Sequence, residues 1–298
     1  MAKKPKSAGS EKLLFNKLRQ FDEPGLFQDS YQTPDYIQAN LKDPLRPYQH
    51  GALRYLHYTQ RKREEALLHY RHLLFHMATG AGKTMVMAGT ILYLFKEYGY
   101  QNFIFFVHTD AIIQKTRENL LNPQSPKYLF SQELEIDGEK ITIAPVETFP
   151  SAPESNTIYL KLSTIHKMHD ELNSYRENSI TYEDLKEIPL VLLGDEAHHF
   201  NAGTKAKGKS KTSPENEEQT WERTIENVLA LRPDNRLFEF TATIDLANKD
   251  IGNKYRDRVV YQYDLKQFMN RLPDGFSHIT GRAVQLTNEP AQRVTLLL

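Results

Sequence analysis

Residue types that bind phosphate are concentrated in the segment Met77-Ala-Thr-Gly-Ala-Gly-Lys-Thr84. The segment stands between an apolar stretch, His72–Met77, and a helix-forming stretch, Lys83–Tyr98. Glycines allow backbone N–H groups to turn toward an anion, and the N-terminus of the following helix adds a partial positive charge. Because strand, loop and Gly-Lys-Thr occur together, the pattern favours a phosphate-binding loop over an ordinary glycine-rich turn.

The residues of this loop have separate expected roles. Lys83 is expected to reach the β- and γ-phosphates of a nucleotide, and the hydroxyl of Thr84 is expected to bind Mg²⁺. Met77 stands where the strict pattern has glycine, but this departure removes no phosphate ligand. The backbone of four residues would line the phosphates: Thr79, Gly80, Ala81 and Gly82.

A pair of carboxylates follows a second apolar stretch. Residues 189–194 are mainly apolar and end in Asp195-Glu196-Ala197-His198. Carboxylates at the carboxyl edge of a parallel strand face the crevice where ligands bind in open α/β sheets. Asp195 is therefore expected to hold Mg²⁺, directly or through water, and Glu196 to orient or deprotonate the water that attacks the γ-phosphate. An acidic pair alone is more often structural, but here it follows a phosphate loop in the same chain.

Short apolar segments alternate with segments whose apolar residues recur at helical spacing. This alternation predicts an α/β fold with a doubly wound, mostly parallel sheet. An insertion at residues 134–143 is expected to be a hairpin, because Asp137-Gly138 supplies the positive φ angles of a two-residue turn. Strands are expected at His72–Met77, Asn102–Val107, Ile158–Leu162, Leu190–Leu193 and Arg236–Phe240, and helices at Lys83–Tyr98, Asp110–Leu121, Thr164–Tyr175 and Thr220–Leu231.

The phosphate loop and the Asp-Glu-Ala-His sequence together resemble the first RecA-like domain of the superfamily-two helicases with a DEAH box. Within these helicases the chain is most similar to the restriction-subunit group, which includes the type III enzymes. The resemblance covers about residues 45–268. Further motifs agree in order: Leu45-Arg-Pro-Tyr-Gln49, Phe106-Val-His-Thr109, Leu162-Ser-Thr164 and Thr241-Ala-Thr243.

The resemblance implies a RecA-like P-loop NTPase domain that uses ATP and Mg²⁺ as an ATP-dependent helicase or translocase. It implies that Gln49 contacts adenine and that Thr109 and Thr164 contact a nucleic-acid backbone. It also implies that Thr241 and Thr243 couple the ATP site to the nucleic-acid site. Threonine hydroxyls both donate and accept, so these two residues could bond with His198 across adjacent strand ends.

The resemblance further implies partners. Duplex DNA is the favoured nucleic acid, and a modification or specificity subunit is a further expected partner. RNA stays open, because contacts to the backbone are similar in the two polymers. Motors of this class place ATP between two RecA-like domains, and the second supplies arginine fingers. We expect the second domain to be missing from this chain, and a fragment that binds nucleotide or nucleic acid without turnover is therefore also an open interpretation.

The expected organisation has four parts. Residues 1–12 are expected to be a disordered basic tail, and residues 13–44 an arm that packs onto a larger body. Residues 45–270 form the RecA-like domain, in which the lysine-rich segment 201–219 is expected to be a mobile loop. Residues 271–298 fit the preceding pattern poorly, and we expect a chain that is truncated or read out of frame near Asn270.

Composition limits the other classes of function. Lys+Arg and Asp+Glu are balanced at 38 each, so a nucleic acid would have to be held by a local basic patch. The chain has no cysteine, which excludes disulfides and thiolate metal sites and fits the reducing cytoplasm, the location that we expect. No apolar run approaches the ~20 residues of a membrane span, and no secretory signal follows the basic N-terminus.

Two other possible sites are set aside. Histidines occur at His166 and His169 and at the adjacent pair 198–199, but their spacing does not match an HExxH zinc motif. A nuclease would need Pro-Asp followed by Asp/Glu-x-Lys, and Pro233-Asp234 with Asp264-Leu-Lys266 satisfies this only loosely. We interpret that match as chance, because the first half lies inside the predicted motor fold.

Overall fold

One sheet of eight strands organises the molecule. The computed structural model describes residues 13–25, 31–60, 70–174, 180–195 and 214–269, with the side chains of 214–221 left out. The strand order is β3-β4-β5-β2-β6-β7-β1-β8, and every pairing except β3 with β4 is parallel. The strands are β1 (His72–Met77), β2 (Asn102–Val107), β3 (Leu134–Ile136), β4 (Glu139–Pro145), β5 (Thr157–Thr164), β6 (Leu190–Asp195), β7 (Arg236–Thr241) and β8 (Val259–Tyr263).

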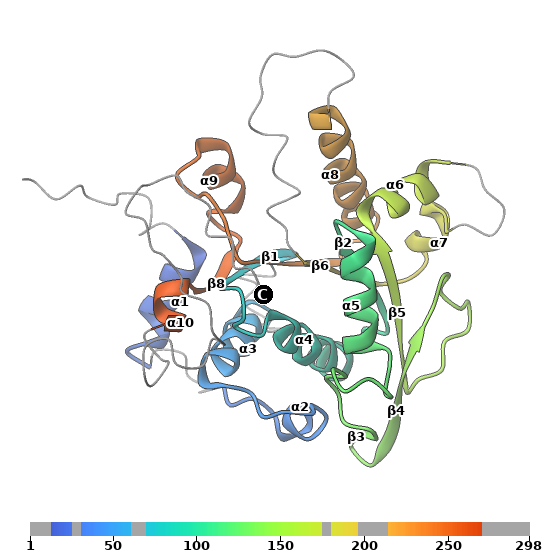
Figure 1. Ribbon diagram of the computed structural model, residues 1–298, viewed down its shortest axis with the longest axis horizontal. Coiled ribbons are helices and arrows are strands. Elements are labelled where there is room, and N and C mark those ends of the chain that lie inside the picture. Colours follow the sequence, from blue (N-terminus) through green and yellow to red (C-terminus); the bar gives the residue numbers. More distant parts are fainter. Residues whose placement is uncertain (1–12, 26–30, 61–69, 175–179, 196–213, 270–298) are drawn as a thin grey trace, which may run out of the picture.

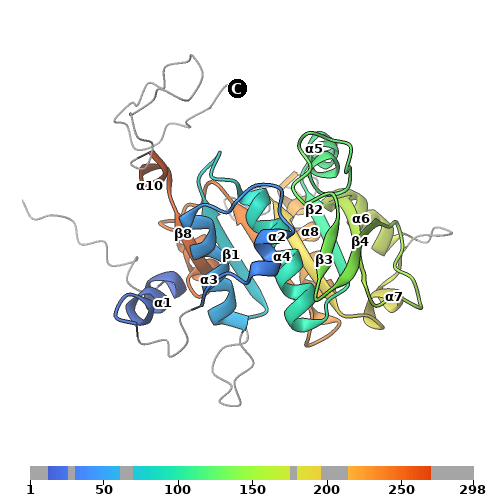
Figure 2. The same cartoon turned by 90° about the horizontal axis from the view of Figure 1, so that it is seen from below.

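Helices cover both faces of this sheet (Figure 1). Helices α3, α4 and α5 lie on one face, and α6, α8 and α9 lie on the other. Figure 2 shows α2 beside α4, against which it packs. The helices are α1 (Leu14–Asp22), α2 (Asp35–Ala39), α3 (Pro47–Gln60), α4 (Lys83–Tyr98), α5 (Asp110–Leu120), α6 (Ile165–Asn173), α7 (Tyr182–Lys186), α8 (Pro214–Ala230), α9 (Lys249–Tyr255) and α10 (Leu265–Met269).

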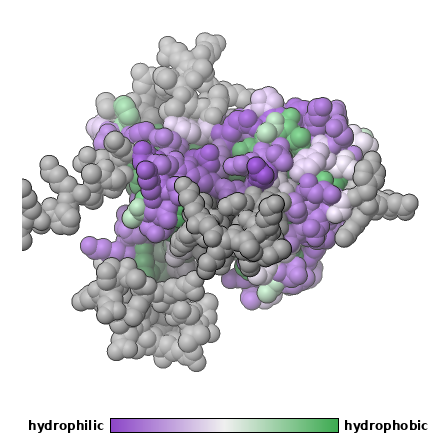
Figure 3. Space-filling model, turned by 90° about the horizontal axis from the view of Figure 1, so that it is seen from above, coloured by the Kyte–Doolittle hydropathy of each residue, from purple (hydrophilic) through white to green (hydrophobic). Residues whose placement is uncertain are grey.

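The central strands are buried on both sides. All residues of β2 and β5 are buried, as are the first five of β6. Continuous apolar strands such as Phe103–Val107 are typical of parallel sheets that helices cover on both faces. The described surface is by contrast mainly hydrophilic on the face that Figure 3 shows. The doubly wound, mostly parallel α/β fold that the sequence predicts is confirmed.

Several predicted boundaries move by a few residues. Strands β1 and β2 and helix α4 have the predicted ends, and the predicted hairpin is present with Asp137 at φ 55° and Gly138 at φ 80°. The mobile loop expected over 201–219 is wrong at its end, because α8 already begins at Pro214. Proline is well placed in the first turn of a helix, since its missing N–H would have no partner there. The remainder of that segment lies outside the described residues, as do the expected tails at 1–12 and 271–298.

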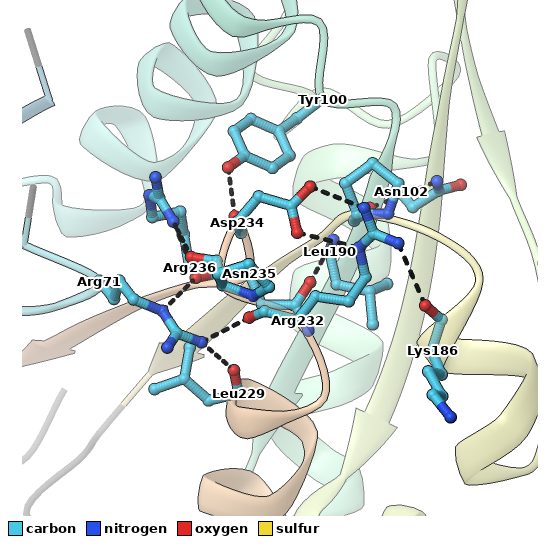
Figure 4. A network of polar contacts seen from close by, with 12 residues as sticks. Arg71, Tyr100, Asn102, Lys186, Leu190, Leu229, Arg232, Asp234, Asn235 and Arg236 are labelled. Atoms are coloured by element: carbon cyan, nitrogen blue, oxygen red, sulfur yellow. Dashed lines mark hydrogen bonds and ion pairs between the residues drawn. The ribbon is translucent and has the colours of Figure 1, made fainter. Parts of the chain in front are cut away.

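A polar network holds the amino ends of the strands together (Figure 4). Asn235, just before β7, is fully buried, and its side chain accepts from the N–H of Leu190 at 2.9 Å and donates to the carbonyl of Val228 at 2.9 Å. The guanidinium of Arg71, just before β1, donates to the carbonyls of Asn235 (3.3 Å) and Arg232 (2.6 Å). These bonds tie the starts of β1, β6 and β7 to the end of α8.

The same network settles where Asp234 lies. Its carboxylate accepts two hydrogen bonds of 2.9 Å from Arg232, which lower the pKa of Asp234 against a smaller opposing effect of burial. Asp234 precedes β7, whereas Asp264 follows β8, so the two carboxylates lie at opposite edges of a parallel sheet. Strands of about six residues separate these edges by about 20 Å. Asp234 and Asp264 therefore cannot share a nuclease cation.

Replacing Asn235 by alanine is expected to destabilise the fold. The substitution leaves the buried N–H of Leu190 without its Asn235 partner, at a cost of about 1–3 kcal/mol. It also removes the shorter of two hydrogen bonds to the carbonyl of Val228, which still accepts from the N–H of Leu231, at a cost of about 1 kcal/mol. We expect a total loss of about 2–4 kcal/mol in the free energy of unfolding, measured by urea denaturation. The control is Asn253→Ala at an exposed position of α9, where the change should stay within about 0.5 kcal/mol. Equal losses would contradict the role given to Asn235.

A candidate nucleotide site at the carboxyl edge of the sheet

The loop between β1 and α4 turns through two glycines in the left-handed region. Gly80 has φ 79° and Gly82 has φ 75°, conformations that residues with a Cβ rarely adopt. Gly82 is the N-cap of α4, and no side chain caps this end of the helix. The N–H groups of Lys83 and Thr84 at the start of this helix of 16 residues have no described partner and are available to an anion, whereas those of Met85 and Val86 donate to the carbonyl of Gly82. Thr79 and Gly80 are exposed, whereas Ala81 is buried and its N–H donates to the carbonyl of Ala78 at 3.1 Å.

Lys83 and Thr84 occupy the first turn of α4, as the sequence predicts. The ammonium of Lys83 lies 3.4 Å from the carbonyl of Met77, and no carboxylate of a described residue forms an ion pair with it. Both side chains are partly exposed. An ammonium that has only a long bond to a carbonyl, beside uncapped N–H groups, is suited to a polyphosphate.

Gln49 supports the phosphate loop from behind. Its side chain is buried with 5% exposed, and its amide nitrogen lies 3.1 Å from the carbonyl of Ala81 and 3.4 Å from that of Gly82. Its amide oxygen accepts from the N–H of Arg46 at 2.8 Å. A Cβ added to Gly82 would collide with the amide nitrogen of Gln49. The described contacts of Gln49 thus hold the loop, and its contact with adenine stays a prediction.

Asp195 lies on the same edge of the sheet as the phosphate loop. It ends β6 and pairs in register with Phe240 of β7, which in turn pairs with Phe75 of β1. Adjacent strands lie about 4.8 Å apart, so the Cα atoms of Asp195 and Phe75 are about 10 Å apart. The loop begins directly after Met77, two residues beyond Phe75. Glu196 and His198 lie outside the described residues, so the structure does not place them.

The Thr241-Ala-Thr243 segment lies at the end of β7, the strand between β6, which carries Asp195, and β1, which leads into the phosphate loop. The hydroxyl of Thr241 donates to the carbonyl of Thr243 at 2.8 Å and accepts from the N–H of the same residue at 3.2 Å. Thr241 is buried and Thr243 is exposed. These two bonds join the ends of the turn, and the predicted bonds to His198 stay a prediction because that residue is not described.

The two threonines predicted to contact nucleic acid differ in exposure. Thr109, just after β2, is exposed, and its side chain does not cap α5. Thr164 ends β5 with 6% exposed, and its hydroxyl accepts from the N–H of Lys167 at 3.1 Å, which caps α6. Both lie at the carboxyl edge of the sheet. Only Thr109 of the two presents its side chain to solvent.

Two groups near the site carried no signal in the sequence. The ring of Phe268 in α10 lies 3.7 Å from where a Cβ of Gly80 would be, and it meets Tyr263 edge to face. His76, in β1 beside the loop, bonds to the carbonyl of Ala242. The sequence did not reveal them because only the strand order brings β8 and β7 to the two sides of β1.

Farther from the carboxyl edge, a buried carboxylate in the middle of β7 links this strand to the start of β1. Glu239 accepts from His72 at 2.5 Å and from the hydroxyl of Tyr255 at 3.3 Å. Burial alone would raise the pKa of Glu239, but the charge and hydrogen bond of His72, with Lys254 and Tyr255, hold that pKa below its ordinary value. The ionised carboxylate is thus a structural link from β1 through β7 to α9.

The family model for "Type III restriction enzyme, res subunit" matches residues 42–246. That range includes the phosphate loop, Asp195 and the Thr-Ala-Thr turn. This chain belongs to that family. The sheet places the loop directly after β1 and Asp195 at the end of β6, in the doubly wound, mostly parallel arrangement that the sequence predicts.

Known proteins resemble this Res-family chain to different degrees. It is 35% identical over 294 residues to the "probable type III restriction-modification enzyme HindVIP Res subunit" of Haemophilus influenzae, covering 90% of this chain and 56% of that protein. The chain thus spans about half the length of the curated relative that it matches. A structure of the ATP-dependent type ISP restriction-modification enzyme LlaBIII bound to DNA has a TM-score of 0.48 at 16% identity, covering 77% of this chain and 16% of the other. The SWI2/SNF2 ATPase core of Sulfolobus solfataricus with dsDNA has a TM-score of 0.43 at 13% identity, covering 74% and 36%.

The residues at this edge fit a magnesium nucleotide. The hydroxyl of Thr84 and the carboxylate of Asp195 are oxygen donors of the kind Mg²⁺ prefers, and Lys83 supplies a cation for the phosphates. Within the described residues no group of three or more His, Cys, Asp and Glu gathers to hold a metal. Protein sites for Mg²⁺ commonly use one or two carboxylates together with substrate phosphates, which agrees with this sparse set. Among the described helices none is long and apolar enough to cross a membrane.

Gly82→Ala is expected to weaken nucleotide binding, because the new Cβ would displace the amide of Gln49 that supports the loop. Gly99→Ala is the matched control. It lies at the other end of α4 with φ 72° and open space around it, so both variants bear the same left-handed strain of about 1 kcal/mol. Titration with a fluorescent ATP analogue should show at least about tenfold weaker binding for Gly82→Ala alone. Equal weakening in the two variants would contradict the steric argument.

Proposed function

We propose that this chain is the ATP-binding first motor domain of a DNA translocase or helicase in a restriction-modification system. The observation that carries the proposal is the placement of an open phosphate loop and Asp195 at one edge of the sheet, with the Thr-Ala-Thr turn between them. Membership of the Res family supports the same function. The motor would act on DNA in the cytoplasm.

The proposal gives each residue one task. Lys83 and the loop amides from Gly80 to Thr84 hold the phosphates, and Thr84 with Asp195 holds Mg²⁺. The metal would neutralise charge that develops on the transferred phosphate. Glu196 accepts a proton from, or orients, the attacking water. Gln49 keeps the loop in shape and contacts the adenine edge.

The nucleic acid is proposed to bind along the same carboxyl edge, farther toward β5. Thr109 is exposed at the start of α5 and is placed to contact a phosphate of the polymer. Thr164 is proposed to act mainly by fixing the first turn of α6, because its hydroxyl already caps that helix. The name of one structural neighbour states that it was bound to DNA, and this supports DNA as the polymer.

Two partners belong to the proposal. A modification subunit would complete the restriction system, as the names of the relatives indicate. A second RecA-like domain would supply an arginine finger, which can be worth about 10³–10⁵ in rate. The proposal therefore assigns hydrolysis to the intact enzyme and nucleotide binding to this domain.

Lys83→Ala should weaken ATP binding, because it removes a charge-assisted bond to phosphate. Such a bond is worth about 1.5–3 kcal/mol, which corresponds to about 10- to 100-fold in affinity. Lys96→Ala is the control, since this lysine lies in the last turn of the same helix and pairs with Asp137. Calorimetric titration with a non-hydrolysable ATP analogue measures both. Unchanged affinity in Lys83→Ala would sink the proposed site.

Glu196→Gln should stop hydrolysis and leave binding intact, because glutamine keeps the size of the side chain but cannot accept a proton. We expect kcat of the intact enzyme to fall about 10²- to 10⁴-fold, measured as phosphate release. Glu226→Gln, at an exposed position on α8, should leave kcat unchanged. Normal turnover by Glu196→Gln would refute its role as the base.

Stimulation of hydrolysis by different polymers separates the rival functions. We expect duplex DNA to raise the ATPase rate of the intact enzyme and RNA of equal length to leave it near the basal rate. Stimulation by RNA alone would favour an RNA helicase. Nucleotide binding without phosphate release under any condition would identify a catalytically silent binding protein.

A further inference from the structure

A histidine in the phosphate-loop strand bonds directly to the turn that ends the neighbouring strand. The Nε2 atom of His76 lies 3.2 Å from the carbonyl oxygen of Ala242, the central residue of the Thr241-Ala-Thr243 segment. A carbonyl oxygen can only accept a hydrogen bond, so Nε2 must carry the hydrogen and donate it. This bond crosses from β1 to β7, since His76 pairs in register with Thr241.

The other ring nitrogen of His76 forms no described hydrogen bond that would explain the residue. Nδ1 is buried and has no hydrogen-bond partner among the described residues. Burial lowers the pKa of His76; the bond to Ala242 and the charge of Asp264 raise it by less, and the charge of Lys83 lowers it. The ring is therefore a neutral donor, and its one described hydrogen bond is the one to the turn.

His76 also adjoins the contact made by the phosphate-binding lysine. The next residue, Met77, offers its carbonyl to the ammonium of Lys83 at 3.4 Å. If Lys83 moves to a phosphate, the carbonyl of Met77 loses its contact with the ammonium. This change takes place at the residue next to His76. His76 would pass such a change to Ala242, and Thr241 holds the rest of the turn as one unit through its two bonds to Thr243.

We propose that His76 is a positioning residue that couples occupancy of the phosphate loop to the Thr241-Ala242-Thr243 turn. The proposal rests on the proposed function, because it presupposes that nucleotide binds at Lys83. It deepens that function by naming the side chain through which nucleotide binding changes the affinity for DNA. By linkage, DNA changes the affinity for nucleotide by the same factor.

His72 provides a contrast within the same strand. It stands four residues earlier on the same face of β1 and also bonds to β7, but its partner is the buried carboxylate of Glu239. That bond lies in the middle of β7, away from the loop and the turn. Its loss should lower stability without changing communication between the two sites. His72 is therefore the matched control for His76.

The test compares two amides that differ in reach. The side-chain nitrogen of His76→Gln can take the place of Nε2 and keep the bond to Ala242, whereas that of His76→Asn is too short to do so. The readout is the ratio of duplex DNA affinities of the intact enzyme with and without a non-hydrolysable ATP analogue. A single neutral hydrogen bond corresponds to about a 2- to 12-fold change in an equilibrium constant.

We expect His76→Asn to move the ratio of DNA affinities toward 1 by this 2- to 12-fold factor. His76→Gln should keep the ratio close to that of the native protein, and so should His72→Gln. Affinity for the analogue without DNA should stay within about twofold in all three. Hydrogen exchange of the peptide that covers residues 240–248 gives a second readout. Its change on nucleotide binding should be present in the native protein and His76→Gln and absent in His76→Asn. If His76→Asn does not fold, His76→Leu replaces it.

The outcomes separate the two proposals. If the native protein does not bind the analogue, the proposed function fails. If it binds the analogue but shows no coupling, or if His76→Asn keeps the full ratio and the full exchange response, the inference on His76 is overturned and the nucleotide site stands. Equal loss of coupling in His72→Gln and His76→Asn would also overturn it, because a general loosening of β1 against β7 would then explain both.

Discussion

The parallel pairing of β6 with β7 and of β7 with β1 is the constraint on which the candidate site depends. Strands that run in one direction end at one edge, so the phosphate loop, the Thr-Ala-Thr turn and Asp195 come together although more than 100 residues of sequence separate the first from the last. A shift of one residue in either pairing would turn Asp195 to the other face of the sheet. The fold thus positions the chemistry through backbone register.

The phosphate loop needs support beyond its own glycines. Gln49 belongs to a different helix, α3, and its amide nitrogen contacts the carbonyls of Ala81 and Gly82 at the end of the loop. A side chain at position 82 would occupy the space of the Gln49 amide, so the contact of Gln49 with the loop requires glycine at this position. The Leu-Arg-Pro-Tyr-Gln segment thus contributes to the loop geometry before any ligand binds.

The two edges of the sheet have different tasks. At the amino edge, Asn235, Arg71 and Arg232 satisfy backbone groups, and Asp234 is neutralised by an arginine. At the carboxyl edge, Lys83 lacks a described acidic partner, and the first turn of α4 has no side-chain cap. Polar groups that are satisfied internally stabilise the fold, whereas groups left with spare bonding capacity can bind ligands. The two edges therefore divide stability from function.

The sequence alone determined the α/β class, the phosphate loop and the order of the strands along the chain, because apolar periodicity and glycine placement are local properties. It predicted β1, β2 and α4 to the residue, and it indicated the family through the loop and the Asp-Glu-Ala-His segment together. Only the tertiary structure decided that Gln49 holds the loop, that Thr164 is buried and that His76 bonds to Ala242. Those contacts join residues that are distant in sequence, and they arise from strand order and register, which no local pattern encodes. The early start of α8 was missed for a related reason, since residues 214–219 contain no apolar residue to mark a buried helical face.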